Sequence, residues 1–119
     1  MRFLSIISSA EGQGPPPQAL MDAMGKLIEA SLNDGSLVQT GGLAASATGT
    51  RVRCANRKLT VTDGPFTESK EVIGGYAIIE APTREAALES TRNFMELHRR
   101  HWPEWEGECE LREIAFLAP

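Results

Sequence analysis

Hydrophobic residues along the chain recur in patterns that predict several strands. Residues 3–8 and 73–81 are apolar on both alternating sides, which predicts strands that are covered on both faces. A shorter apolar run at 37–40 ends in glycines and predicts a third strand. The mixed segment 110–117, in which Leu111, Ile114, Phe116 and Leu117 are apolar, predicts the last strand.

A hairpin is predicted in the middle of the chain. Residues 51–55 and 58–62 alternate apolar and polar side chains on either side of Asn56 and Arg57. One face is apolar, and the other carries Arg51 and Arg53. This polar face is either an exposed sheet surface or the lining of a ligand site.

Two segments have helical periodicity. Between residues 18 and 33, apolar side chains recur at Leu20, Met24 and Leu27, and Asn33 to Gly35 form a stop signal. The second helix follows Thr83, its predicted N-cap, and ends near Trp102, before Pro103. Its sheet-facing stripe comprises Ala87, Leu88, Thr91, Phe94, Met95 and His98.

The elements follow the order β-α-β-(hairpin)-β-α-β, which predicts one α+β domain over residues 1–119. Two helices cover only one face of a sheet, yet strands 3–8 and 73–81 are apolar on both faces. A second copy of the chain is the simplest cover for the other face, so the sequence predicts a homodimer.

Composition is ordinary for a globular protein, with 41% hydrophobic and 24% charged residues among 119. The net charge of −4 argues against sequence-independent binding of nucleic acid. No apolar run is long enough to span a membrane, and residues 1–8 are too short for a signal peptide. Cys54 and Cys109 have no paired spacing, which favours reduced thiols in a cytoplasmic protein.

The stretch 60–80 is the most distinctive part of the chain. Asp63 precedes Gly64 and Pro65 in a tight turn, where its carboxylate is expected to accept hydrogen bonds from downstream backbone N–H groups. Gly74 and Gly75 interrupt an apolar strand, which indicates a β-bulge or the close approach of another backbone or ligand. Asp63 is therefore either part of a structural corner or a carboxylate that lines a site.

The stretch 60–80 resembles the signature of the YCII-related family, in its DGPF branch. The resemblance covers nearly the whole chain, and the matching segments are 61–66, 68–71, 74–76, 50–53, 84–88, 98–103 and 107–110. It implies a ferredoxin-like fold, with an antiparallel sheet and two helices on one face, that dimerises into an α/β barrel.

The resemblance also implies a possible acid/base pair. Better-understood relatives take a histidine from the first helix and an aspartate from near the second strand. This chain has no histidine between residues 18 and 33 and no carboxylate in 39–42, so that pair is not transferred.

Asp63 and His98 are the acid/base candidates of this chain itself. A histidine titrates near neutrality, and a carboxylate at a strand end would orient it. Arg53 and Lys70 are candidates to hold an anionic group of a substrate. Three more residues near the motif and at the end of the second helix are substrate-binding candidates: Tyr76, His101 and Trp102.

The sequence does not predict a metal site. His98 and His101 lie three apart on one helix face, and Glu104, Glu108 or Cys109 would have to complete the site. A metal needs three or four convergent ligands, and spacing alone does not supply them.

Two functions follow from these residues. The first is a small cofactor-independent enzyme that uses acid/base chemistry on a small organic molecule, for which an anionic group is one alternative. The second is a non-catalytic ligand-binding or protein-interaction module with a regulatory role. Motifs for nucleotides, redox thiols or a serine nucleophile are absent from the sequence.

Overall fold

The computed structural model describes residues 1–66 and 70–118. Its elements, in chain order, are β1 (Arg2–Ser9), α1 (Gln18–Asp34), β2 (Leu37–Gly42), the 3₁₀ turn η1 (Ser46–Thr48), β3 (Thr50–Ala55), β4 (Lys58–Asp63), β5 (Val72–Glu80), α2 (Arg84–His101) and β6 (Gly107–Glu113). The Glu68 and Ser69 positions of the family signature lie outside the described residues.

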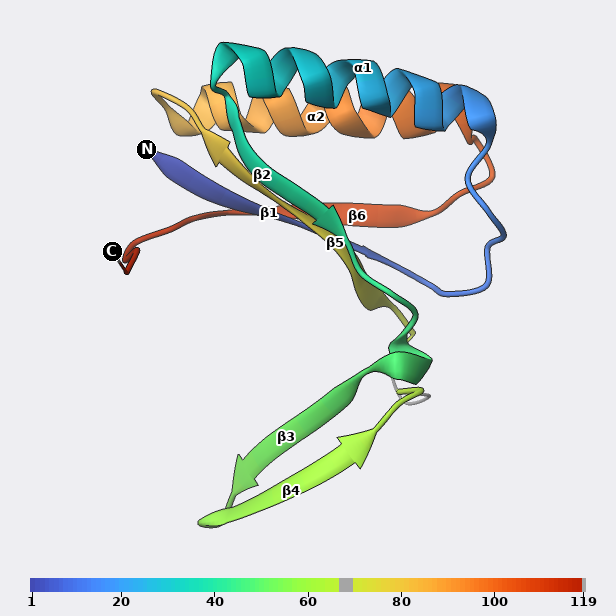
Figure 1. Cartoon of the computed structure of the whole chain (residues 1–119), viewed down its shortest axis with the longest axis vertical. Coiled ribbons are helices and arrows are strands. Elements are labelled where there is room, and N and C mark those ends of the chain that lie inside the picture. The colour runs from blue at the N-terminus through green and yellow to red at the C-terminus, as the bar shows by residue number, and fades with distance from the viewer. Residues whose placement is uncertain (67–69, 119) are drawn as a thin grey trace.

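The body of the molecule has two layers. A four-stranded antiparallel sheet has the order β2-β5-β1-β6, and α1 and α2 lie side by side over one of its faces (Figure 1). Strands β3 and β4 form a separate two-stranded sheet that extends away from the body (Figure 1). The predicted α+β class, the element order and the ferredoxin-like arrangement of helices on one face are confirmed.

The core lies between the sheet and the helices. Phe3 on β1 and Ile79 on β5 are paired across the sheet, and their side chains are 2% and 8% exposed. Ala87 on α2 packs against them and is fully buried. Because Cβ atoms alternate along a strand, these positions place Leu4 and Ile6 of β1 on the opposite, helix-free face.

The glycine pair in β5 produces the predicted bulge. Ile7 pairs with Gly75 and Ser8 with Ile73, so Gly74 has no partner on β1. A Cβ atom on Gly75 would lie 3.2 Å from the carbonyl oxygen of Gly41 on β2. The two glycines therefore combine a bulge with a close approach of two backbones.

The start of α2 and the end of α1 lie where the sequence predicts them. Thr83 Oγ1 accepts a hydrogen bond from the backbone N–H of Ala86 at 3.1 Å, which satisfies one of the free N–H groups of the first turn. Gly35 adopts a left-handed conformation (φ 82°) after α1, and its N–H donates to the carbonyl of Leu32. Among the described residues, no helix is long and apolar enough to cross a membrane.

The predicted last strand, 110–117, is wrong in its bounds. β6 spans Gly107–Glu113 and pairs with β1 from Ser9↔Gly107 to Phe3↔Glu113. The strand ends there because β1 begins at Arg2, whose carbonyl accepts a final bond from the N–H of Ile114. Apolar residues beyond this point, such as Phe116 with 83% exposure, do not extend the sheet.

Candidate ligand-binding cavity

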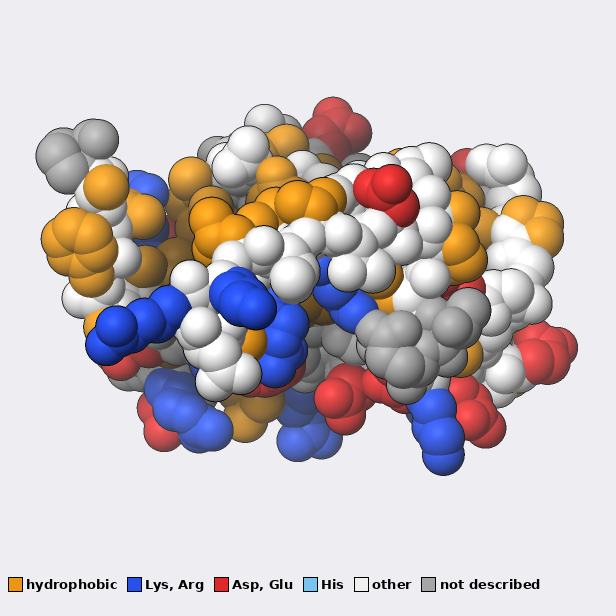
Figure 2. Space-filling view, turned by 90° about the horizontal axis from the view of Figure 1, so that it is seen from below, with side chains coloured by type: hydrophobic (Ala, Val, Ile, Leu, Met, Phe, Trp, Pro, Cys, Tyr) orange, Lys and Arg blue, Asp and Glu red, His pale blue; other side chains and the backbone are white. Residues whose placement is uncertain are grey.

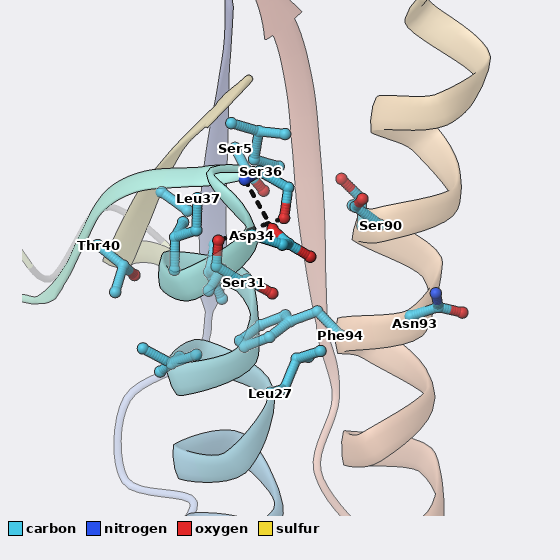
Figure 3. Close-up of a pocket in the computed structure, with 15 residues that line it drawn as sticks. Ser5, Leu27, Ser31, Asp34, Ser36, Leu37, Thr40, Ser90, Asn93 and Phe94 are labelled. Atoms are coloured by element: carbon cyan, nitrogen blue, oxygen red, sulfur yellow. Dashed lines mark hydrogen bonds between the residues drawn. The ribbon is translucent and has the colours of Figure 1, made fainter. Parts of the chain in front are cut away.

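A cavity of about 270 Å³ lies between the two helices and the sheet, beside β2 (Figure 3). Seven of its described lining residues are apolar and seven are polar but uncharged, and one is a carboxylate. The lining residues are Ile7, Leu27, Ile28, Leu37, Ala77, Ile79 and Phe94; Ser5, Ser31, Ser36, Thr40, Ser90, Thr91 and Asn93; and Asp34.

The cavity exists because the sheet contributes small side chains beneath the groove between the helices. Ser5 on β1 and Ala77 on β5 are paired neighbours in the sheet. Leu27 and Ser31 of α1 lie one turn apart and line one side of this floor, and Phe94 of α2 lies on the other (Figure 3). Larger side chains at Ser5 and Ala77 would fill the space.

Asp34 gives the cavity a negative electrostatic potential. It is the last residue of α1, where the helix dipole is negative, and the last turn of α1 contains no basic residue. The backbone N–H of Ser36 donates to Asp34 Oδ1 at 2.8 Å. Hydrogen bonds from the side chain and backbone of Ser36 hold the pKa of the exposed Asp34 carboxyl below its usual range. Asp34 is therefore ionised at neutral pH.

Some of the polar groups around the cavity are already used by the protein. The hydroxyl of Thr40 donates to the carbonyl of Tyr76 at 2.8 Å, and that of Thr91 donates to the carbonyl of Ala87 at 3.0 Å. Within the described part of the chain, the side chains of Ser31, Ser90 and Asn93 form no hydrogen bond. These three side chains remain available to a ligand.

The polar side chains approach the cavity from both helices. Ser90 and Asn93 of α2 lie across the cavity from Asp34 at the end of α1 (Figure 3). A ligand between the helices could therefore place a positively charged group near Asp34 and exchange further hydrogen bonds with α2.

Asp63, one predicted catalytic residue, lies outside this cavity at the end of β4. Its Oδ1 accepts a hydrogen bond from the hydroxyl of Thr50 at 3.0 Å, directly across the β3–β4 pair. This contact gives Asp63 a structural partner at the base of the hairpin. Its catalytic role stays a prediction.

His98, the other predicted catalytic residue, faces the sheet side of α2, as its spacing predicted, and is 8% exposed. Its Nδ1 donates to the carbonyl of Phe94 at 3.1 Å, and its ring lies 4.8 Å from the Phe94 ring and 4.7 Å from the Trp105 ring, between centroids. Burial lowers the pKa of His98, so the imidazole is neutral at pH 7. His98 and Asp63 have these separate sets of partners and do not contact each other within the described protomer.

The predicted substrate-binding residues are spread over three parts of the fold. Arg53 is exposed on β3, Lys70 is exposed shortly before β5, and Tyr76 on β5 covers Gly41 on the helix-free face. His101 and Trp102 end α2, where the Trp102 ring stacks on Trp105 at 6.0 Å between centroids. None of these five lines the cavity, and their roles stay predictions.

The His98–His101 pair does not gain a third ligand. Within residues 1–66 and 70–118, no three His, Cys, Asp or Glu side chains are grouped closely enough to hold a metal ion. The ring of His98 is instead enclosed by aromatic neighbours.

Comparison with known protein families agrees with this architecture. Residues 1–96 match the YCII-related domain, which is more than half of the chain. The chain belongs to the YCII-related family. No curated protein matches it. The matched region contains Asp34 and all the other residues that line the cavity, but it ends before His98, His101 and Trp102.

The cavity residues of this YCII-related chain were not predicted as a site. The sequence places Asp34 in the stop signal of α1 and Thr91 in the sheet-facing stripe of α2. A hydroxyl within an otherwise apolar stripe was the available signal. It indicates a polar interior position, but the sequence alone does not reveal that an open space adjoins it.

Proposed function

We propose that this YCII-related protein binds a small neutral or cationic organic molecule in the cavity between α1, α2 and the sheet. The observation that carries the proposal is the charge of the lining: among the described residues, Asp34 is the only charged one. Apolar side chains would cover the body of such a ligand, and the hydroxyl and amide groups would orient it.

Protonated primary amines with a short apolar chain fit this lining best. The ammonium group would lie near the Asp34 carboxylate, and the chain would lie between Leu27 and Phe94. The volume of about 270 Å³ is at the small end of ligand sites, which favours compact ligands.

Binding without catalysis is better supported than acid/base catalysis. Asp34 has a lowered pKa and makes a poor base near neutrality, and His98 does not line the cavity. An anionic ligand held by Arg53 or Lys70 would need a site elsewhere, since neither lines this cavity.

We also infer that the protein is a homodimer. The helix-free face of the sheet carries two cross-strand pairs of apolar residues, Leu4↔Ile78 and Ile6↔Tyr76, along its two central strands. A second copy would remove this apolar surface from water. The DGPF branch, the regulatory role and the cytoplasmic location remain predictions from the sequence.

Three probes of equal length and different charge test the ligand proposal. We would titrate pentylammonium, 1-pentanol and pentanoate into ¹⁵N-labelled protein and follow the amide signals of Leu27, Asp34 and Phe94. We expect affinity to fall in the order ammonium, alcohol, carboxylate. Tightest binding by pentanoate, or shifts confined to residues outside the cavity, would contradict the proposal.

A matched pair of variants separates the local effect of Asp34 from a general effect of net charge. Asp34→Asn should remove the preference for pentylammonium over 1-pentanol, which we expect to be at most about fivefold because the carboxylate is exposed. Asp22→Asn, also on α1 but outside the cavity, should keep it. An equal loss in both variants would indicate a general effect of net charge.

A further inference from the structure

The β3–β4 hairpin, residues 50–63, which we call the arm, exposes an unusually apolar face. Val52 pairs with Val61 and Cys54 with Leu59, so these four side chains share one face of the arm. Val52, Leu59 and Val61 are 66%, 73% and 69% exposed, and Cys54 is also exposed. Figure 2, which views the molecule from the side of the arm, shows hydrophobic side chains in a band with Lys and Arg side chains beside it.

The arm has little support from its own chain. An isolated two-stranded hairpin is at best marginally stable in water, and the arm is not hydrogen-bonded into the four-stranded sheet. The molecule is correspondingly extended: its radius of gyration is 16.0 Å, against about 13.5 Å for a compact domain of this length. A covering surface is needed to stabilise the arm.

We propose that the apolar face of the arm packs on the helix-free sheet face of a second copy of the chain. This assignment rests on the homodimer proposed above and identifies the segment that forms it. The receiving surface is the apolar pair of strands described there, centred on Ile6 and Tyr76. Each apolar surface then covers the other, which removes both from water in the same step.

Charge complementarity identifies the occupant as a second copy. The arm carries Arg51, Arg53, Arg57 and Lys58 against Asp63, a net charge of +3. Because the whole chain carries −4, the remainder carries −7. The arm of one copy is therefore attracted to the body of another. A nucleic acid would also attract the positive charge of the arm, but its phosphate backbone would not cover the four apolar side chains.

The receiving face has acidic residues beside its apolar centre. On β6, Glu108 pairs with Ser8 and Glu110 with Ile6, so both carboxylates lie on the helix-free face. Glu110 already forms an ion pair with Arg112, whereas Glu108 is exposed at the edge strand. Arg51, Arg53 and Lys58 lie on the opposite face of the arm. Arg57, in the turn at the tip, is therefore the arm cation best placed to meet these carboxylates.

The exchange is mutual and closes at two copies. Each copy has one arm and one helix-free sheet face, so a twofold arrangement pairs both arms with both faces. Neither surface remains free to recruit a third copy.

The test uses Leu59→Glu, with Leu32→Glu as a matched control. Leu59 is 73% exposed on the arm, and Leu32 is 48% exposed on α1. Sedimentation equilibrium should give a dimer for the wild type and Leu32→Glu, and a dissociation constant at least about tenfold higher for Leu59→Glu. Raising the salt concentration should weaken the wild-type dimer.

Alkylation of Cys54 gives a second measurement that reports on the arm itself. Mass spectrometry of the peptide that contains Cys54 would follow the rate of alkylation. In the wild type this rate should fall as the protein concentration rises through the range in which the dimer forms. In Leu59→Glu the alkylation rate of Cys54 should stay high at all of these concentrations. Circular dichroism of the variant should show that its body remains folded.

The outcomes separate this inference from the homodimer. A monomeric wild type would overturn both. If Leu59→Glu still dimerises like the wild type, the homodimer stands but docking by the arm is overturned. The same holds if Cys54 of the wild-type dimer is alkylated at the same rate at all protein concentrations. Tight binding of duplex DNA through the arm, with no change in assembly, would also overturn it.

Discussion

The turn that begins at Asp63 leaves no space for a side chain at Gly64. A Cβ atom at this position would lie 1.8 Å from the carbonyl oxygen of Ser46 and 2.8 Å from its carbonyl carbon. Cβ atoms essentially never approach other heavy atoms within 3.0 Å, so one backbone segment would have to move by at least about 1.2 Å. The same Ser46 carbonyl accepts from the N–H of Gly49, and Gly64 N–H donates to the carbonyl of Gly49.

Gly64→Ala should therefore disrupt the base of the arm. Forced overpacking costs about 1–3 kcal/mol, and we expect this loss in the free energy of unfolding measured by urea denaturation. At a chain length of 119 residues, it corresponds to a fall in melting temperature of roughly 4 °C per kcal/mol. The expectation concerns backbone contacts and does not depend on any role of Asp63 in chemistry.

Gly25→Ala is the matched control, because a Cβ atom there meets no atom within 4 Å and the residue lies in α1. Replacing a helical glycine by alanine should stabilise the protein by about 0.8–1 kcal/mol. The reasoning would be refuted if Gly64→Ala unfolded within about 0.5 kcal/mol of the wild type while Gly25→Ala behaved as expected. Position 64 would then tolerate a side chain, and crowding against Ser46 would not explain the glycine in the family signature.

Three further predictions concern the body of the molecule. Phe3→Ala should lower the free energy of unfolding by about 3–5 kcal/mol in urea denaturation, because the side chain is 2% exposed in the core. Thr83→Ala should cost about 1 kcal/mol, read as a lower melting temperature, because it removes the cap on α2. His98 has a pKa lowered by burial, so the unfolded chain binds more protons: stability should be complete above about pH 6.5 and fall as the pH drops below it. Urea denaturation of the wild type and His98→Phe across this range should show a weaker pH dependence in the variant.

Periodicity was enough to predict the body of the fold. The Thr83 cap and the glycine stop each depend on residues within a few positions, and both are present in the structure. Of the predicted sheet-facing stripe of α2, Ala87, Thr91 and His98 are buried. Leu88 was wrongly placed in that stripe, because its side chain is 37% exposed. The end of the last strand depends instead on where its partner β1 begins, which local patterns do not encode. This is why residues 114–117 were assigned to a strand that stops at Glu113.

The candidate site was harder to predict because a cavity depends on what is missing as much as on what is present. Ser5 and Ala77 come from strands more than seventy positions apart, and only their pairing in the sheet places two small side chains together. Histidine and aspartate are common residues of acid/base sites, yet His98 packs against aromatic rings and Asp63 accepts a hydrogen bond from a cross-strand hydroxyl. Asp34 has an ordinary place at a helix end, and only the open space beside it makes its charge available to a ligand.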